Sequence, residues 1–206
     1  MSRSAHVGLT LGEDGTPHHA RAEPDLFGFW VFLMSDALLF ALLFATYGAM
    51  LVGTAGGPGP RDLFELKPTL IETALLLTSS FTWGMASVAL KYGDAKPRLL
   101  AWMGTTLVLG VAFLSMEVND FATMFAKGAF PTRSGFLSAF FGLVPLHGLH
   151  VLAGCIWISV MAVQVVVIGT DERTKTNLLR LGLFWHFLDI IWIAIFSVVF
   201  LQGLAP

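Results

Sequence analysis

Five apolar segments constrain the fold of this chain more strongly than any other feature of its sequence. Each is near the roughly 20 residues that a helix with about 1.5 Å rise per residue needs to cross a bilayer. The chain is 55% hydrophobic and only 13% charged, so it has too few polar side chains to cover a soluble domain. We therefore expect an all-α integral membrane protein, a five-transmembrane-helix bundle. The expected spans are approximately Leu26–Val52, Pro68–Leu90, Leu99–Phe121, Phe136–Ile168 and Leu178–Gly203.

This pattern divides the chain into a polar tail and a transmembrane domain. Residues 1–25 are polar and of mixed charge, so we expect a disordered cytoplasmic tail in which the adjacent His18 and His19 are solvated. The tail contains no short apolar core of the kind that a secretory signal peptide requires. Residues 26–206 form the transmembrane domain.

The distribution of charge limits both orientation and function. Five crossings place the termini on opposite sides, and the side of the N-terminus collects eight Lys and Arg residues against four on the other side. The positive-inside rule then puts the N-terminus in the cytoplasm and the C-terminus outside. The net charge of −2, without any basic cluster, argues against a nucleic-acid-binding protein. With Cys155 as its single cysteine, the chain forms no intrachain disulfide.

Ionisable side chains inside the spans are the candidate functional residues, because such groups are costly at membrane depth and are often functional. They are Asp36, Glu72, Glu117, His147, His150, His186 and Asp189, with Asp120 at the end of the third span. Because helix direction alternates, the three histidines and the two aspartates should fall at middle depth. Glu72 and Glu117 should lie near the outer surface, which predicts two polar layers.

The spacing of these residues indicates which way they face. His147 and His150 are three residues apart, as are His186 and Asp189, so each pair shares one face of its helix. Pro145 removes a backbone donor and is expected to bend the fourth helix close to His147. The polar faces should therefore point into the bundle.

Small residues predict where helices approach closely. Ser138 with Gly142, and Ser80 with Gly84, have the small-xxx-small spacing that favours close helix contact in membranes.

The connection at residues 53–67 contains glycines and prolines that break helices. We expect its apolar residues Leu63, Phe64 and Leu66 to rest at the membrane interface.

Three interpretations of the histidines stay open on the sequence pattern alone. In the first they bond to carboxylates and backbone carbonyls between helices, in the second they ligate a metal or haem, and in the third they belong to a proton path. The packing interpretation is favoured, because Asp36 and Asp189 are ready partners for imidazoles.

The acids have structural interpretations as well. Glu72 is expected in the first turn of its helix, where the helix dipole favours a carboxylate. Glu117 is near the end of its helix, where the dipole does not favour a carboxylate, so we expect it to have a partner on the second or fourth helix. Asp36, deep in the first helix, is expected to be protonated, bonded to His or Ser, or in contact with water or a lipid head group.

The residues around these polar groups resemble a known family. The fourth span reads RSGFLSAFFGLVPLHGLHVLAG, the fifth LFWHFLDIIWI, the second IETALLLTSSFTWGMA and the first FGFWVFLMSDALLF. Together they are similar to subunit III of the haem-copper oxidases, over essentially the whole chain after the tail. The five spans, the GTAGGP loop, FEL before the second span and SMEVNDF in the third resemble the bo-type ubiquinol oxidase branch more than the cytochrome c oxidase branch, which typically has seven helices.

The resemblance implies roles for individual residues. His147, His150, His186 and Asp189 match family positions that are regarded as parts of helix packing. Asp36 matches a position where many members carry a carboxylate, commonly Glu, facing the bundle interior; here the side chain is one methylene shorter. The family's subunit III holds no haem or copper, so no catalytic, cofactor-binding or metal-binding residue is expected in this chain.

The resemblance also implies partners. Haem b, haem o and copper are expected in partner subunit I, which reduces O2 to water and pumps protons, and phospholipid is expected to bind beside it. The chain is then the accessory subunit III of a proton-pumping ubiquinol oxidase, partnered with subunits I, II and IV in the bacterial cytoplasmic (inner) membrane, with a periplasmic C-terminus. Ubiquinol is a substrate of the complex rather than of this chain. The alternatives are a short cytochrome c oxidase subunit III and, from another class, a haem- or metal-binding membrane redox protein.

Overall fold

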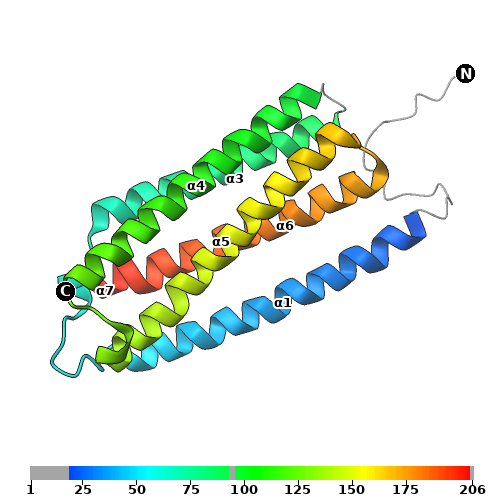
Figure 1. Cartoon of the computed structure of the whole chain (residues 1–206). Helices are drawn as coiled ribbons and strands as arrows, with labels where there is room; N and C mark the ends of the chain where they lie inside the picture. Colours follow the sequence, from blue (N-terminus) through cyan, green and yellow to red (C-terminus); the bar gives the residue numbers. More distant parts are fainter. Residues whose placement is uncertain (1–18, 93–95, 205–206) are drawn as a thin grey trace, which may run out of the picture.

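The computed structural model describes residues 19–92 and 96–204, and within them the chain is all-helical (Figure 1). The long helices are α1 (His19–Met50), α3 (Leu66–Lys91), α4 (Lys96–Ala126), α5 (Gly135–Val167) and α6 (Glu172–Ile195). Shorter elements are α2 (Pro60–Leu63), the 3-10 helix η1 (Pro131–Arg133), the π-helix η2 (Phe196–Leu201) and α7 (Gln202–Leu204). Among these described residues, five helical stretches are long and apolar enough to cross a membrane, which confirms the predicted spans.

The first helix begins earlier than the sequence pattern suggests. α1 starts at His19, so residues 19–25, which were assigned to the polar tail, are helical. Ala20, Arg21 and Ala22 are strong helix formers, so the local sequence supports this extension. Residues 1–18, including His18, lie outside the described part of the chain.

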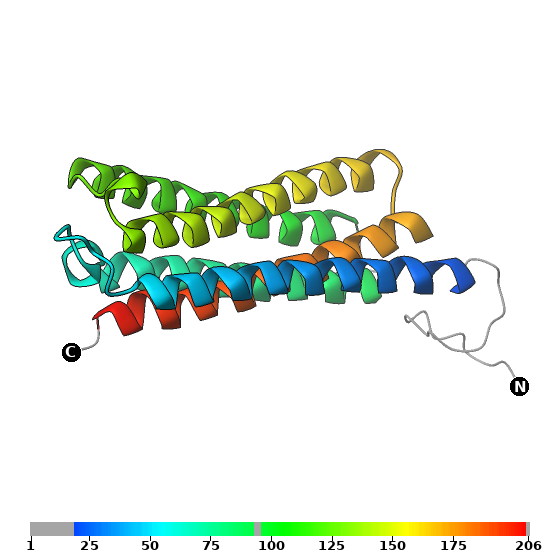
Figure 2. The same ribbon diagram turned by 90° about the horizontal axis from the view of Figure 1, so that it is seen from below.

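Four of the long helices form a ring. α3 packs on α4, α4 on α5, α5 on α6, and α6 closes the ring by packing on α3. α1 lies outside this ring and packs on α5 and α6, which Figures 1 and 2 show as a separate blue helix along the bundle. Among the described helices, α1 thus makes its main contacts with α5 and α6, the last two long helices.

An indole lies between two glycines inside the ring of helices. Trp185 of α6 is 1% exposed and lies against Gly110 of α4 and Gly154 of α5. A Cβ atom at Gly154 would stand 2.9 Å from the indole Cζ3, and one at Gly110 would stand 2.9 Å from Cη2. We call this arrangement the Trp185 slot; it needs a glycine on each side.

The glycines that the small-xxx-small pattern singled out do not lie at close contacts. A Cβ atom at Gly84 would meet nothing within 4 Å, and one at Gly142 would only reach Leu43 Cδ2 at 4.0 Å. The prediction of close helix contact at these glycines is therefore wrong. Spacing along one helix does not reveal whether a bulky side chain of another helix arrives there.

The connection before α3 is folded into the end of the bundle. Leu63 and Phe64 are 5% and 4% exposed, so the prediction that they rest at the interface is wrong for both. The Phe64 ring packs on three rings of α5 and η2, those of Phe136, Phe140 and Phe200. Leu66, in contrast, is exposed.

Candidate functional site: the polar groups inside the bundle

A carboxylate–imidazole pair joins α1 to α5. His150 Nε2 lies 3.2 Å from Asp36 Oδ2, and both side chains are mostly buried. His150 Nδ1 is 2.7 Å from the Leu146 carbonyl oxygen, which only accepts, so Nδ1 carries a hydrogen. The two groups are within ion-pair distance, although Asp36 Oδ2 makes no hydrogen bond in the described part of the chain.

His147 bonds to the backbone of the neighbouring helix. Its side chain is fully buried, and Nε2 lies 3.2 Å from the Leu188 carbonyl of α6, so Nε2 is the donor. Nδ1 has no hydrogen-bond partner among the residues that the structure describes. The imidazole lies beside the rings of Phe113 and Trp192, with centroid distances of 6.0 Å and 5.3 Å. His147 therefore links α5 to α6 within an aromatic setting.

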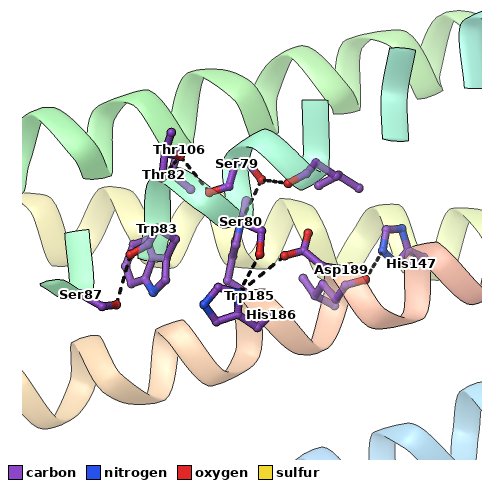
Figure 3. Close-up of polar contacts among 12 residues, drawn as sticks. Ser79, Ser80, Thr82, Trp83, Ser87, Thr106, His147, Trp185, His186 and Asp189 are labelled. Atoms are coloured by element: carbon purple, nitrogen blue, oxygen red, sulfur yellow. Dashed lines mark hydrogen bonds and ion pairs between the residues drawn. The ribbon is translucent and has the colours of Figure 1, made fainter. Parts of the chain in front are cut away.

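His186 and Asp189 of α6 meet Ser80 of α3 (Figure 3). Ser80 Oγ is 2.7 Å from His186 Nδ1, and Asp189 Oδ2 is 3.8 Å from the same nitrogen. A hydrolytic triad would need the serine at one ring nitrogen and the carboxylate at the other. Since both groups face Nδ1, this trio cannot relay a proton from Ser80 to Asp189 through the ring.

Hydroxyl and indole groups supply further bonds between helices. Figure 3 shows two of them, Trp185 Nε1 to Ser79 Oγ at 3.1 Å and the pair Thr82–Thr106 at 2.8 Å. A third joins Trp192 Nε1 to Thr73 Oγ1 at 3.1 Å. The sequence analysis missed these residues. Trp185 and Trp192 are seven residues apart, a spacing that puts both on one helix face and was a usable signal.

The two glutamates are buried. Glu72 and Glu117 are 2% and 4% exposed, and the Oε1 atom of each lacks a hydrogen-bond partner in the described part of the chain. The prediction that Glu72 sits in the first helical turn is wrong, because α3 begins at Leu66 and has no acid in its first turn.

Glu117 lies deeper than predicted. Its carboxylate packs directly on Gly148 of α5, the residue after His147, where a Cβ atom would stand 2.8 Å from the carboxyl carbon. The outer and middle polar layers thus meet at this point, whereas the sequence predicted separate layers. The expected neighbour on the fourth span is present, but it is a glycine backbone position rather than a polar side chain.

The candidate residues do not converge on one point. Within residues 19–92 and 96–204, no three His, Cys, Asp or Glu side chains are grouped so that they could hold a metal ion. His147, His150 and His186 instead contact Leu188, Asp36 and Ser80, respectively. Asp36 and Asp189 are imidazole partners, as the packing interpretation predicted. The geometry describes a multi-pass helical membrane protein whose interior polar groups bond to one another and to backbone across helix boundaries.

Comparison with known proteins assigns this bundle to a family. The family model described as cytochrome c oxidase subunit III matches residues 16–204. The chain belongs to this family, which confirms the resemblance to subunit III of the haem-copper oxidases.

Relatives from both branches of the family match nearly the whole chain. The cytochrome bo(3) ubiquinol oxidase subunit 3 of Pseudomonas aeruginosa is 48% identical over 193 residues, which cover 94% of this chain and 92% of the relative. The quinol oxidase subunit 3 of Bacillus subtilis is 39% identical, with 94% and 96% covered. The cytochrome c oxidase subunit 3 of Bacillus sp. PS3 is 40% identical, with 86% and 85% covered.

Proposed function

We propose that this chain is the accessory, non-redox subunit III of a proton-pumping terminal ubiquinol oxidase in the aerobic respiratory chain. It supports assembly, phospholipid binding and sustained proton uptake by subunit I, which holds haem b, haem o and copper and reduces O2 to water. Subunits II and IV complete the complex. The observation that carries the proposal is the similarity, over 94% of the chain, to a cytochrome bo(3) ubiquinol oxidase subunit 3.

The contacts of the polar residues support a role without a redox centre. A haem or metal ion needs donor atoms that converge from facing helices. In the described part of the chain, no three His, Cys, Asp or Glu side chains are grouped in this way, and the three histidines contact different partners, Leu188, Asp36 and Ser80. We therefore expect the cofactors in subunit I.

The proposed location is the bacterial cytoplasmic (inner) membrane, with the N-terminus in the cytoplasm and the C-terminus in the periplasm. The excess of Lys and Arg on the N-terminal side supports this orientation. Reporter fusions at the two ends of the chain test it, and periplasmic activity of a reporter at the N-terminus would reverse the assignment.

Capture of the chain through a tag in mild detergent tests the proposal. The captured complex should show a haem spectrum and contain copper, and both should leave when the partner subunits are stripped. It should oxidise quinol. Iron or copper that stays with the separated, folded chain would show that its histidines are ligands, which contradicts the proposal.

A second candidate is a short cytochrome c oxidase subunit III. It is favoured by the 40% identity to the cytochrome c oxidase subunit 3 of Bacillus sp. PS3. The electron donor separates the two candidates: a complex that is reduced by cytochrome c and not by quinol would establish the second.

A further inference from the structure

His186 is a polar side chain on the mostly apolar outer face of α6. Its side chain is 46% exposed, although it lies near the middle of the stretch at residues 173–201 that is long enough to cross the membrane. Exposed residues that follow on this side are Ile190 and Ile193 of α6 and, in the π-helix η2 that continues it, Ser197. Their spacings of four, three and four residues align them with His186 along one side of the helix. We call these four residues the His186 stripe.

The imidazole is anchored from inside but open to the outside. Ser80 Oγ lies 2.7 Å from Nδ1, and Asp189 stands behind the ring with its side chain 7% exposed. In the described part of the chain, no group bonds to Nε2. The ring is therefore held in a fixed orientation with one nitrogen available.

The hydrocarbon of the lipid cannot form a hydrogen bond with His186 Nε2. Lipid acyl chains carry no hydrogen-bonding group, and phospholipid head groups lie at the membrane surface rather than at middle depth. A polar group left without a partner there costs free energy, and such groups normally face protein or a water-filled cavity. At this depth, a polypeptide exposed to lipid is a helix or a closed barrel.

We propose that the His186 stripe seats a transmembrane helix of another oxidase subunit, and that a polar side chain of that helix bonds to His186 Nε2. Ile190 and Ile193 supply the apolar contact on the same side, and Ser197 is small enough for close approach. This inference rests on the proposed function, because it takes the partner from the same complex.

Photo-crosslinking in native membranes tests directly whether a helix of another subunit packs on the His186 stripe. A photoreactive phenylalanine replaces Ile190 or Ile193 in the stripe, and Val108 of α4 and Val163 of α5, which are similarly exposed, give matched positions on other faces. After illumination, the tagged chain is purified and its adducts are identified by mass. Both stripe positions should yield an adduct with one other oxidase subunit. Adducts with lipid alone, with a quinone, with a second copy of this chain or with an unrelated protein would overturn the inference.

Substitution of the histidine tests the hydrogen bond. His186→Leu should release the crosslinked subunit about three- to tenfold faster when the purified complex is diluted in detergent, the range expected for one hydrogen bond between membrane helices. His186→Gln retains hydrogen-bonding groups and should release it more slowly than His186→Leu does. Equal release by the Leu and Gln variants would show that no bond is made.

Ser80→Ala serves as the control for packing within this chain. It removes the internal contact of His186 but leaves Nε2 in place, so it should release the subunit more slowly than His186→Leu does. If Ser80→Ala releases the subunit as fast as His186→Leu, His186 acts only through its own bundle and the inference is wrong. Haem and copper in the tagged complex report on the proposed function separately, so a normal haem spectrum with lipid-only adducts would overturn this inference alone.

Discussion

Replacement of Gly154 by alanine should destabilise the bundle, because the added methyl group enters the Trp185 slot. The new Cβ atom would stand 2.9 Å from indole Cζ3 and 3.0 Å from Cε3. The indole cannot move aside easily, since it lies against Gly110 on its other side and donates a hydrogen bond to Ser79. Either the helices separate or the indole leaves its position.

The magnitude follows from a comparison with Gly104→Ala. Gly104 is on α4 and a Cβ atom there meets nothing within 4 Å, so alanine should gain only the helix-propensity difference of about 0.5–1 kcal/mol. Gly154→Ala has the same gain but adds an overpacking cost of about 2–3 kcal/mol, in the upper part of the usual range because the indole is confined. Helix propensity cancels in the comparison, so the two variants should differ by about 2–3 kcal/mol.

The single cysteine of the chain provides the assay. Cys155 is buried and adjoins the slot, where a Cβ atom at Gly110 would stand 2.9 Å from its sulfur. In the tagged complex in mild detergent, the rate at which a thiol reagent labels Cys155 reports how often the slot opens. Gly154→Ala should label about 30- to 150-fold faster than Gly104→Ala, which is the same free-energy difference expressed as a ratio.

Two results would refute this reasoning. One is equal labelling of the Gly154→Ala and Gly104→Ala variants, which would mean that the indole does not fill the space beside Gly154. The other is additivity of Gly110→Ala and Gly154→Ala. Both substitutions displace the same side chain, so the second should cost less once the first is present.

Three other substitutions test the polar contacts. Asp36→Asn should preserve assembly and O2 reduction but shorten the lifetime of activity during turnover or change lipid retention; complete loss of haem would contradict a packing role. His147→Ala leaves the Leu188 carbonyl without its donor and should cost about 1–3 kcal/mol, seen as weaker retention in detergent with an unchanged haem spectrum wherever assembly survives. Thr174, through its side chain and its backbone N–H, holds the pKa of Asp171 below its usual value, so the stabilisation from this N-cap is present above the unfolded pKa and is lost as pH falls through the folded pKa. The protection factors of the amides at the start of α6, which compare each exchange rate with the intrinsic rate at the same pH, should therefore fall in acid, and Asp171→Ala should abolish that fall.

The spans were predictable because membrane insertion depends on local composition. The roughly 20 apolar residues of a span are contiguous in the sequence, so each span can be recognised without knowing its neighbours. All five predicted spans are helices. The types of partner were predictable too, since Asp36 and Asp189 are carboxylates close in depth to the imidazoles that they contact.

Close contacts were not predictable, because they depend on side chains that arrive from other helices. Gly84 has the small-xxx-small spacing typical of close packing yet faces open space, whereas Gly154 lacks that spacing and lies against an indole. Glu117 was placed too shallow for the same reason: its carboxylate lies over Gly148, whose missing side chain makes the room. The spacing of residues along one helix predicts neither the surroundings of these glycines nor the position of the Glu117 carboxylate.

The place of α1 outside the ring has a consequence for synthesis. The helix is complete at Met50, but the α5 and α6 surfaces on which it packs begin only at Gly135 and Glu172. Since chains are made from the N-terminus, α1 must reside in the bilayer alone while the rest of the bundle is still being translated. Asp36 therefore enters the membrane before His150, the residue that its carboxylate later contacts, has been made.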